Sequence, residues 1–284
     1  MNEIITLGKL IPLVNDIPDY PREINEIAKS IKGDSFDVSS IADYIIEKKA
    51  FLDVFCNLNP DIARSKDIKK RIIEAISKLD NTSLRNIMFT CSLLSLNINE
   101  MTDLVLKKII MSSYICKDII DKVNFYRKTK HNPENFFLYA LFHDIGELFV
   151  AFYFPERMKE ELMRNPNHID FSHINSIVAH NEAGYMMARK WMLPSIFSYI
   201  CLNHNKLEYR KFTADFIYII NAIAVSDAVA LELLNYETPF TNSWDVGHSI
   251  YKIGLREDDI YTESGIIGYS EKKSVKILSL FNLR

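Results

Sequence analysis

The stretch LYALFHDIGELF, residues 138–149, is almost entirely apolar, yet His143 and Asp144 stand side by side in its middle. An ionised side chain is costly to bury unless it is paired or bound to a cation. Neighbouring side chains on a helix point about 100° apart, so both groups can reach one cavity. The pair therefore either binds something together, such as a metal ion, or is the remnant of a site that once did.

Composition limits the classes of function. The chain has 284 residues, of which 48% are hydrophobic and 25% are charged, and its net charge is −3. That is enough apolar material for one large or two small globular cores. The charge balance provides no general attraction to nucleic acid or to acidic lipid, so neither is expected as a partner.

Cysteine usage and the amino terminus predict a cytoplasmic protein. The opening residues, MNEIITLGKLIP, do not resemble a secretory leader, and no CxxC pair is present. Reduced thiols are therefore expected. Residues 136–154 are apolar enough to suggest a membrane span, but a charged carboxylate at mid-bilayer costs about 2.5–3.5 kcal/mol. Asp144 and Glu147 lie in that segment, so we interpret it as a buried helix. The cysteines are Cys56, Cys91, Cys116 and Cys201.

Few glycines and prolines, eight and nine respectively, predict an all-α chain with short loops. Apolar residues recur at helical spacing along it, as at Ile24, Ile27, Ala28 and Ile31. Helices are expected over residues 21–32, 39–49, 66–79, 83–94, 99–120, 134–153, 172–192, 193–204 and 213–234, with further helices in the tail 243–283.

Later helices carry further polar groups inside apolar runs. His180 and Gly184 share a helix face, His204 ends a short helix, and Asp227 lies among alanine, isoleucine, valine and leucine. Gly146 removes a side chain where another helix could approach. Facing helices of a bundle build metal sites in this way. Histidine and carboxylate ligands suit zinc, iron or manganese, and the residues do not choose among them.

Several segments, in order, resemble a known family. LFHDIGEL, residues 141–148, resembles the signature of the HD superfamily of metal-dependent phosphohydrolases. HNEAGYMMARKWMLP at 180–194 and IPDYP at 17–21 are similar to its HDOD branch, the HD-related output domains of bacterial signalling. FCNLNP at 55–60 and the helix at 71–89, with Asp80 where glycine is usual, add to the resemblance, which covers about residues 11–210 and extends loosely to Asp227.

The resemblance implies a multi-helix HD-superfamily-like bundle with an N-terminal helical subdomain. On that basis we expect an N-terminal helical half at 1–105, an HD-like half at 106–235 and a helical extension at 236–284. It also implies a divalent-metal site, the one cofactor suggested. The candidate ligands are His143, Asp144, His180, His204 and Asp227.

Departures from the family pattern weaken the case for catalysis. Active HD hydrolases carry a histidine on the helix before the HD pair, where this chain has Ser112 or Ser113. Asn203 replaces the first of two paired histidines, and no GYP-type motif of the cyclic-dinucleotide phosphodiesterases follows. Outer-shell changes alone cost about 10–100-fold in metal affinity, and a lost ligand should cost at least that. No catalytic residue is assigned.

The favoured interpretation is a non-catalytic, cytoplasmic regulator in a bacterial signalling pathway that acts by binding other proteins. Its HD metal site is degenerate. Residues 11–96 carry no candidate chemistry and are the first choice for the partner surface. Two alternatives stay open: a metal-dependent phosphohydrolase with a reduced ligand set, and a regulator that binds a nucleotide or phosphate without cleaving it. The oligomeric state is not predicted.

Overall fold

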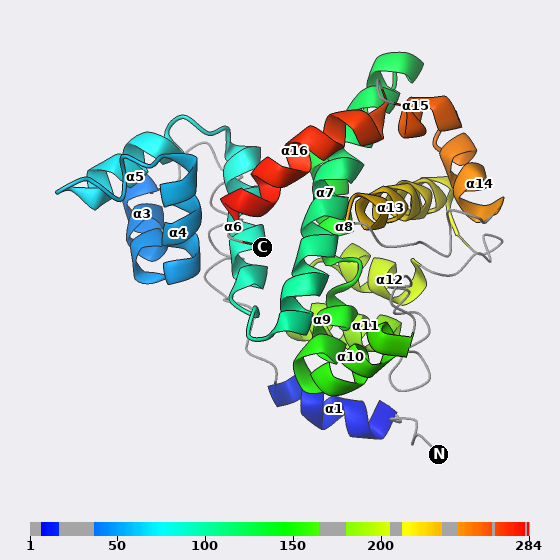
Figure 1. The fold of residues 1–284 in the computed structure, drawn as a ribbon, viewed down its shortest axis with the longest axis horizontal. Helices are drawn as coiled ribbons and strands as arrows, with labels where there is room; N and C mark the ends of the chain where they lie inside the picture. Colours follow the sequence, from blue (N-terminus) through cyan, green and yellow to red (C-terminus); the bar gives the residue numbers. More distant parts are fainter. Residues whose placement is uncertain are drawn as a thin grey trace. The chain divides into compact units, whose positions relative to one another are not determined.

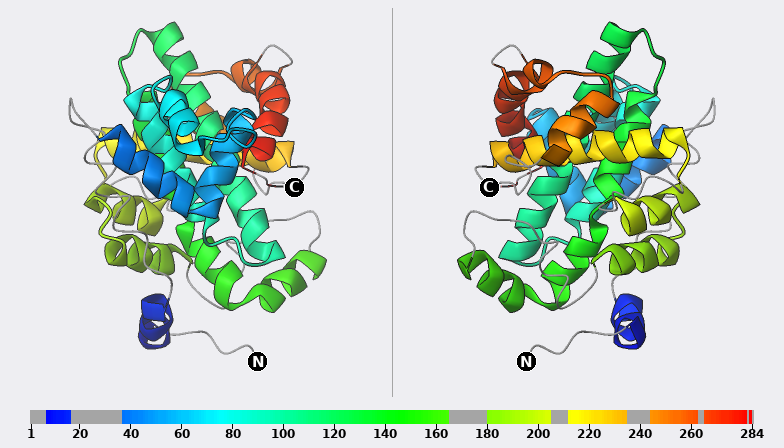
Figure 2. Two further views of the ribbon diagram at one scale, coloured as in Figure 1. Left: turned by 90° about the vertical axis from the view of Figure 1, so that its left-hand side faces the viewer. Right: turned by 90° about the vertical axis from the view of Figure 1, so that its right-hand side faces the viewer.

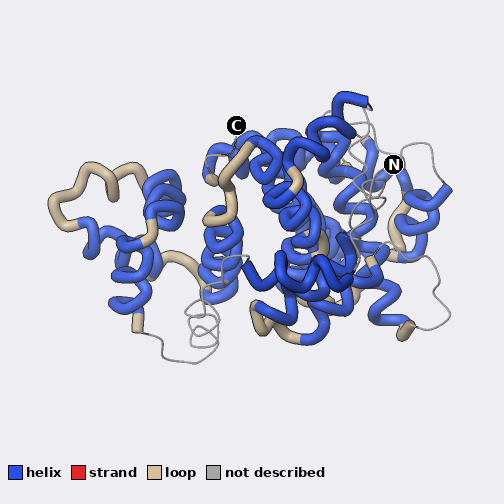
Figure 3. Tube along the Cα trace, turned by 90° about the horizontal axis from the view of Figure 1, so that it is seen from below, coloured by secondary structure: helices blue, strands red, loops and turns tan. Residues whose placement is uncertain are grey.

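The computed structural model describes residues 7–16, 37–164, 180–204, 212–234, 244–262, 265–281 and 283. Their regular secondary structure is α-helical throughout, as the blue tube of Figure 3 shows, which confirms the predicted fold class. The helix expected over residues 21–32 lies outside this part of the chain, as does the first part of the helix expected from residue 172.

Packing divides the chain into two compact units. One unit contains residues 1–18 and 98–274, and the other contains residues 19–97 and 275–284. The second boundary falls within α16 (Ile266–Leu280). The three-part domain division expected from the family resemblance stays a prediction.

The smaller unit is built on four helices in its described residues, α3 (Val38–Glu47), α4 (Lys49–Leu58), α5 (Ile68–Ile76) and α6 (Asn81–Leu94) (Figure 1). Their amphipathic faces bury Ile45, Phe55 and Ile72, among others. Asp80, the departure from the family's usual glycine, is the N-cap of α6: its carboxylate accepts hydrogen bonds from the backbone N–H groups of Thr82 and Ser83. An aspartate at that position therefore satisfies donors that the start of a helix leaves free.

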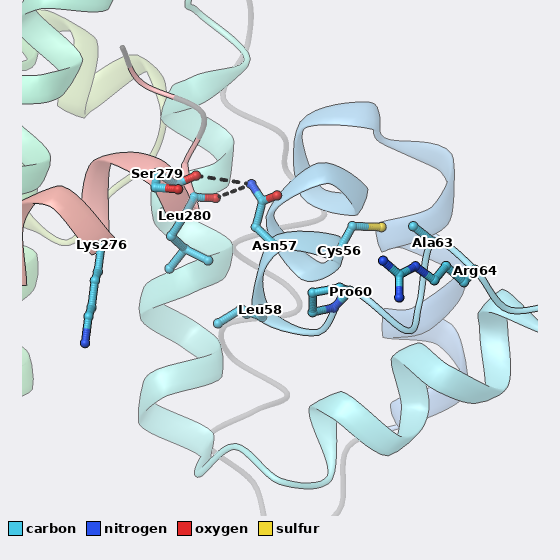
Figure 4. A pocket seen from close by; sticks show the side chains of 9 residues that line it. All are labelled: Cys56, Asn57, Leu58, Pro60, Ala63, Arg64, Lys276, Ser279 and Leu280. Carbon is cyan, nitrogen blue, oxygen red and sulfur yellow. Dashed lines mark hydrogen bonds between the residues drawn. The ribbon is translucent and has the colours of Figure 1, made fainter.

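Asn57 has a structural role in the same unit. Its side-chain Nδ2 donates to the backbone oxygens of Leu280 at 2.9 Å and Ser279 at 3.3 Å, as Figure 4 shows. The last carbonyls of a helix lack partners within that helix. Asn57, which lies in the family-like segment FCNLNP, thus fastens the end of α16 to α4.

The larger unit is organised around the long helix α7 (Glu100–Arg127), whose N-cap is Asn99. Against α7 pack α8 (Pro133–Phe142), α9 (Ile145–Tyr153), α10 (Pro155–Arg164) and α13 (Ala214–Leu233) (Figure 2). A second layer, α11 (His180–Lys190), contacts α9, α12 (Ser195–Asn203) and α1 (Leu7–Asp16). The described part of the unit also contains α14 (Trp244–Lys252), which packs on α13, and the short α15 (Glu257–Tyr261).

The single helix predicted over residues 134–153 is wrong, because the chain breaks at the HD pair. Helix α8 ends at Phe142 and α9 begins at Ile145, with Asp144 at φ −111° and ψ 26°. The carbonyl of Phe142 instead accepts from the Cys201 thiol at 3.1 Å. Nothing in the apolar run, which has no proline there, signals the break.

Two segments are long and apolar enough to cross a membrane, Pro133–Tyr153 and Ala214–Leu233. Of their most apolar windows, 83% and 61% are buried inside the protein, which is the character of core helices. This agrees with the interpretation of residues 136–154 as a buried segment.

Helices α9 and α11 meet at two glycines. A Cβ atom placed on Gly146 would lie 1.8 Å from the carbonyl oxygen of His180 and 2.8 Å from the backbone nitrogen of Gly184. Gly146 therefore permits a backbone approach that no other residue allows, as the sequence predicted. This approach brings His180 beside the HD pair.

We expect Gly146→Ala to lower the free energy of unfolding by at least about 1–3 kcal/mol, because the methyl group meets rigid backbone and the helices must separate. Urea denaturation measures the change. The control is Gly247→Ala, whose added Cβ meets only the end of the flexible Glu257 side chain, at 3.0 Å. Equal losses of stability in the two variants would contradict this account of the contact.

Candidate functional site

The larger unit brings all five predicted site residues into one buried cluster. His143 and Asp144 come from the junction of α8 and α9, His180 from the start of α11, His204 from the end of α12 and Asp227 from α13. The side chains of the histidines and Asp144 are at most 4% exposed, and that of Asp227 is 18% exposed. Four separate segments thus converge, as expected.

Asp144 is the centre of the cluster. Its Oδ2 lies 2.9 Å from His143 Nε2, and its Oδ1 lies 2.7 Å from His204 Nε2 and 3.8 Å from His180 Nε2. His143 Nε2 also lies 3.6 Å from Asp227 Oδ1. The helix break allows one carboxylate to face three imidazoles at once.

Sequence reasoning missed a cation in this cluster, Lys108 of α7. Its Nζ lies 2.7 Å from Asp144 Oδ2, 2.6 Å from Glu147 Oε2 and 3.9 Å from Asp227 Oδ2, and its side chain is 4% exposed. A signal did exist, because Lys108 lies one helical turn before Ser112, on the helix face where the family's histidine was expected.

The side chains at the positions that depart from the family pattern form hydrogen bonds with residues outside the predicted ligand set. The Ser113 hydroxyl donates to the carbonyl of Ile109 in its own helix. The Ser112 hydroxyl lies 3.1 Å from that of Ser226, so it joins α7 to α13. The Asn203 amide donates to the carbonyl of Tyr199 in its own helix at 2.8 Å. None of these side chains takes the place of the missing imidazole.

The backbone decides which ring nitrogens of two histidines carry hydrogen. His143 Nδ1 lies 2.7 Å from the carbonyl of Ala140, and His204 Nδ1 lies 3.0 Å from that of Cys201. A carbonyl only accepts, so each Nδ1 donates. The Nε2 atoms then face Asp144, and a bare lone pair there would repel the carboxylate. A second proton on the ring, or a cation between the atoms, relieves that repulsion.

Electrostatics favours the proton on His143. Burial lowers the pKa of His143, but the charges of Asp144 and Asp227 outweigh it and raise this pKa to about 10. Burial opposes ionisation of Asp144, yet His143 and Lys108 hold its pKa well below the usual range. Burial also lowers the pKa of Lys108, but Asp144, Asp227 and Glu147 raise it further, so the ammonium stays charged.

The cluster can therefore balance its own charge. Burial and the neighbouring Asp144 raise the pKa of Glu147 well above the ordinary value, which favours the protonated acid. Burial lowers the pKa of His180 to about 3, so this ring is neutral. The pKa of Asp227 is lowered, because Lys108 and His143 overcome the effect of burial. Lys108 and His143 then carry positive charge beside the anions Asp144 and Asp227.

The donor types and their spacing suit a metal ion, but the Lys108 ammonium lies where it would repel one. The sets His143/Asp144/His204 and Asp144/Glu147/His180 each place three ligand atoms within 4.8 Å of one another, and both use Asp144. A divalent ion lies about 2.0–2.2 Å from a carboxylate oxygen, so one on Asp144 Oδ2 would lie within about 5 Å of the Lys108 ammonium. Like unit charges 4 Å apart repel by about 4 kcal/mol at an effective dielectric constant of about 20. The charge of Lys108 therefore opposes binding of a divalent ion at Asp144.

The charge state of His143 predicts the pH dependence of stability. Its folded pKa, about 10, exceeds the ordinary 6.5, so its contribution to stability is complete below pH 6.5 and disappears as the pH rises to about 10. We expect the free energy of unfolding of the wild type to fall over that range, and His143→Gln to fall less steeply. Chemical denaturation across the range measures both slopes.

Ser198→Ala is the matched control, because Ser198 is buried on α12 and its hydroxyl donates to the backbone of Ser195. This variant should keep the slope of the wild type. Parallel curves for the wild type and His143→Gln would contradict a charged imidazole in the cluster.

Comparison with known proteins agrees with the fold. A sequence model of the HDOD domain matches residues 17–207. No curated protein matches the chain. An HDOD domain protein of unknown function from Geobacter sulfurreducens has a similar structure, with 17% identity and a TM-score of 0.63 over 98% of each chain.

A protein from Shewanella amazonensis SB2B, provisionally named a phosphohydrolase, has 13% identity and a TM-score of 0.62 over 96% of this chain and 97% of its own. At these identities the likeness concerns the fold alone. The match of the family model extends over most of the chain, from before α3 to the end of α12, and includes both the HD pair and His204. The chain belongs to the HDOD domain family.

Proposed function

We propose that this HDOD protein is a non-catalytic regulator in bacterial signalling that acts in the cytoplasm by binding other proteins. One observation carries the proposal: the Lys108 ammonium lies 2.7 Å and 2.6 Å from the carboxyl groups of Asp144 and Glu147. Asp144 is a predicted metal ligand, and both acids belong to sets of donor atoms close enough together to hold an ion. The cluster then serves to hold helices together.

Hydrolysis of a phosphoester at an HD site depends on a metal that activates water and polarises the phosphate. Here the acidic groups are already neutralised from within. Lys190, the basic residue that follows His180 on α11, donates to the carbonyls of Asn15 at 2.7 Å and Val14 at 3.2 Å, at the end of α1. These contacts argue against both the phosphohydrolase alternative and a phosphate-binding pocket at the cluster.

We expect purified protein to hydrolyse bis(p-nitrophenyl) phosphate and nucleotides no faster than its His143→Ala/Asp144→Ala variant, in the presence of Mg²⁺, Mn²⁺ or Zn²⁺. Product release is measured by absorbance and by chromatography. Hydrolysis that depends on metal and disappears in the double variant would overturn the proposal and favour an enzyme with a reduced ligand set.

The smaller unit offers a surface for a protein partner. A pocket of about 660 Å³ lies there between α4, the loop after it and the end of α16, as Figure 4 shows. Leu58 is 40% exposed at this pocket, and Arg64 and Lys276 add exposed positive charge. A partner segment with apolar and acidic side chains would complement it. The pocket is lined by Cys56, Asn57, Leu58, Pro60, Ala63, Arg64, Lys276, Ser279 and Leu280.

We expect Leu58→Asp and Arg64→Glu to reduce at least one specific interaction by about tenfold or more, since truncating a central interface residue commonly costs over 1 kcal/mol. Partners captured from the source cells and identified by mass spectrometry would be re-titrated against each variant. Phe125→Asp, at an exposed position of the larger unit, is the control. Full retention of every partner by both pocket variants would contradict this surface.

A further inference from the structure

A built-in cation distinguishes this cluster from a metal site that has merely lost a ligand. Deleting one imidazole leaves a weak site, because catalytic metal sites tolerate open positions. Here a ligand is missing and a positive charge is added as well. The Nζ atom of Lys108 lies within 3.9 Å of the carboxyl groups of Asp144, Glu147 and Asp227. Its side chain is 4% exposed, so water does not screen that charge.

We propose that Lys108 is the resident cation of the cluster: its ammonium stands in for a divalent ion, excludes one from Asp144, and conceals a metal site that removing the lysine would open. The inference rests on the proposed non-catalytic function and explains it at the level of one side chain.

Local packing explains why a lysine, and not a nearer residue, supplies the charge. Ser112 and Ser226 are both fully buried and their hydroxyls are 3.1 Å apart, so no imidazole fits at position 112 with α7 and α13 this close. Lys108 is one turn away on the same face, and its four-carbon stem spans the remaining distance. Its neighbour Lys107 points elsewhere and pairs with Asp103 of its own helix at 2.7 Å.

The ligands that the lysine conceals are imidazole nitrogens and carboxyl oxygens. Without its ammonium, Oδ2 of Asp144 and Oε2 of Glu147 would lose their contact with Lys108. The Nε2 atoms of His143, His180 and His204 would still lie within 3.8 Å of Asp144. Imidazole nitrogen combined with carboxylate oxygen suits first-row divalent ions such as Zn²⁺ and Mn²⁺, and an ion that binds His143 Nε2 displaces the proton from that atom. The inference therefore predicts a gain of binding, which a merely structural lysine would not produce.

The test uses full-length protein purified without a histidine tag and stripped with chelator. Zn²⁺ and Mn²⁺ are titrated by calorimetry, and bound metal is counted by mass spectrometry after dialysis. We expect Lys108→Met to bind an ion at least about 100-fold more tightly than the wild type, because a nearby like charge is gone. Lys107→Met, which removes a lysine from the same helix outside the cluster, should bind as the wild type does.

Two further variants keep the test decisive. Lys108→Met leaves buried carboxylates unpaired and could fail to fold, so Lys108→Met/Glu147→Gln, which also removes an acid, is measured beside it. His143→Ala in either background should abolish the gained ion. Circular dichroism verifies folding, and the melting temperature of the lysine variants, unlike that of the wild type, should rise with added metal.

The other outcomes distinguish failure of the Lys108 proposal from failure of the proposed function. If neither folded lysine variant gains an ion, or if wild-type protein already binds one tightly through His143, Lys108 is not the resident cation. Wild-type metal binding without hydrolysis would leave the proposed non-catalytic function standing. Metal-dependent hydrolysis by the wild type would instead overturn that function.

Discussion

The larger unit depends on the ion pair between Lys108 and Asp144. The two charged atoms are 2.7 Å apart, and both side chains are buried. The pair joins the long helix α7 to the junction of α8 and α9. Taking two charges out of water costs several kcal/mol for each ion, and losing one partner leaves the other uncompensated, at about 3–5 kcal/mol. Neighbouring elements supply groups that face the pair. These groups belong to His143, His204, Glu147 and Asp227.

The backbone is arranged to make this pairing geometrically attainable. Asp144 lies at the break between α8 and α9, with φ −111° and ψ 26° outside the helical range. The break after Phe142 lets one oxygen face Lys108 and the other face His204. Gly146 then lets α11 approach until its backbone nearly touches α9, which places His180 beside the same carboxylate. Both features serve a single buried aspartate.

The sequence predicted the helical fold and the five clustered residues, because polar groups inside apolar runs are costly and must meet somewhere. It could not predict the break, since neither His143 nor Asp144 stops a helix and no proline intervenes. It also missed Lys108. Adjacent lysines at 107 and 108 are typical of a solvated helix face. Tertiary packing decides which of the two lysines turns inward.

Replacing an ion by a side chain also changes what the fold depends on. Where metal ligands are assembled by folding, the free energy of metal binding is part of the free energy of folding, and stability follows the supply of metal. An ammonium on α7 is covalently part of the chain and is present whenever the chain is. A regulator that works by presenting a surface must stay folded under all conditions in which its partner is present. A tethered cation meets that need, whereas a hydrolase needs an ion with an open position for water, which a lysine cannot provide.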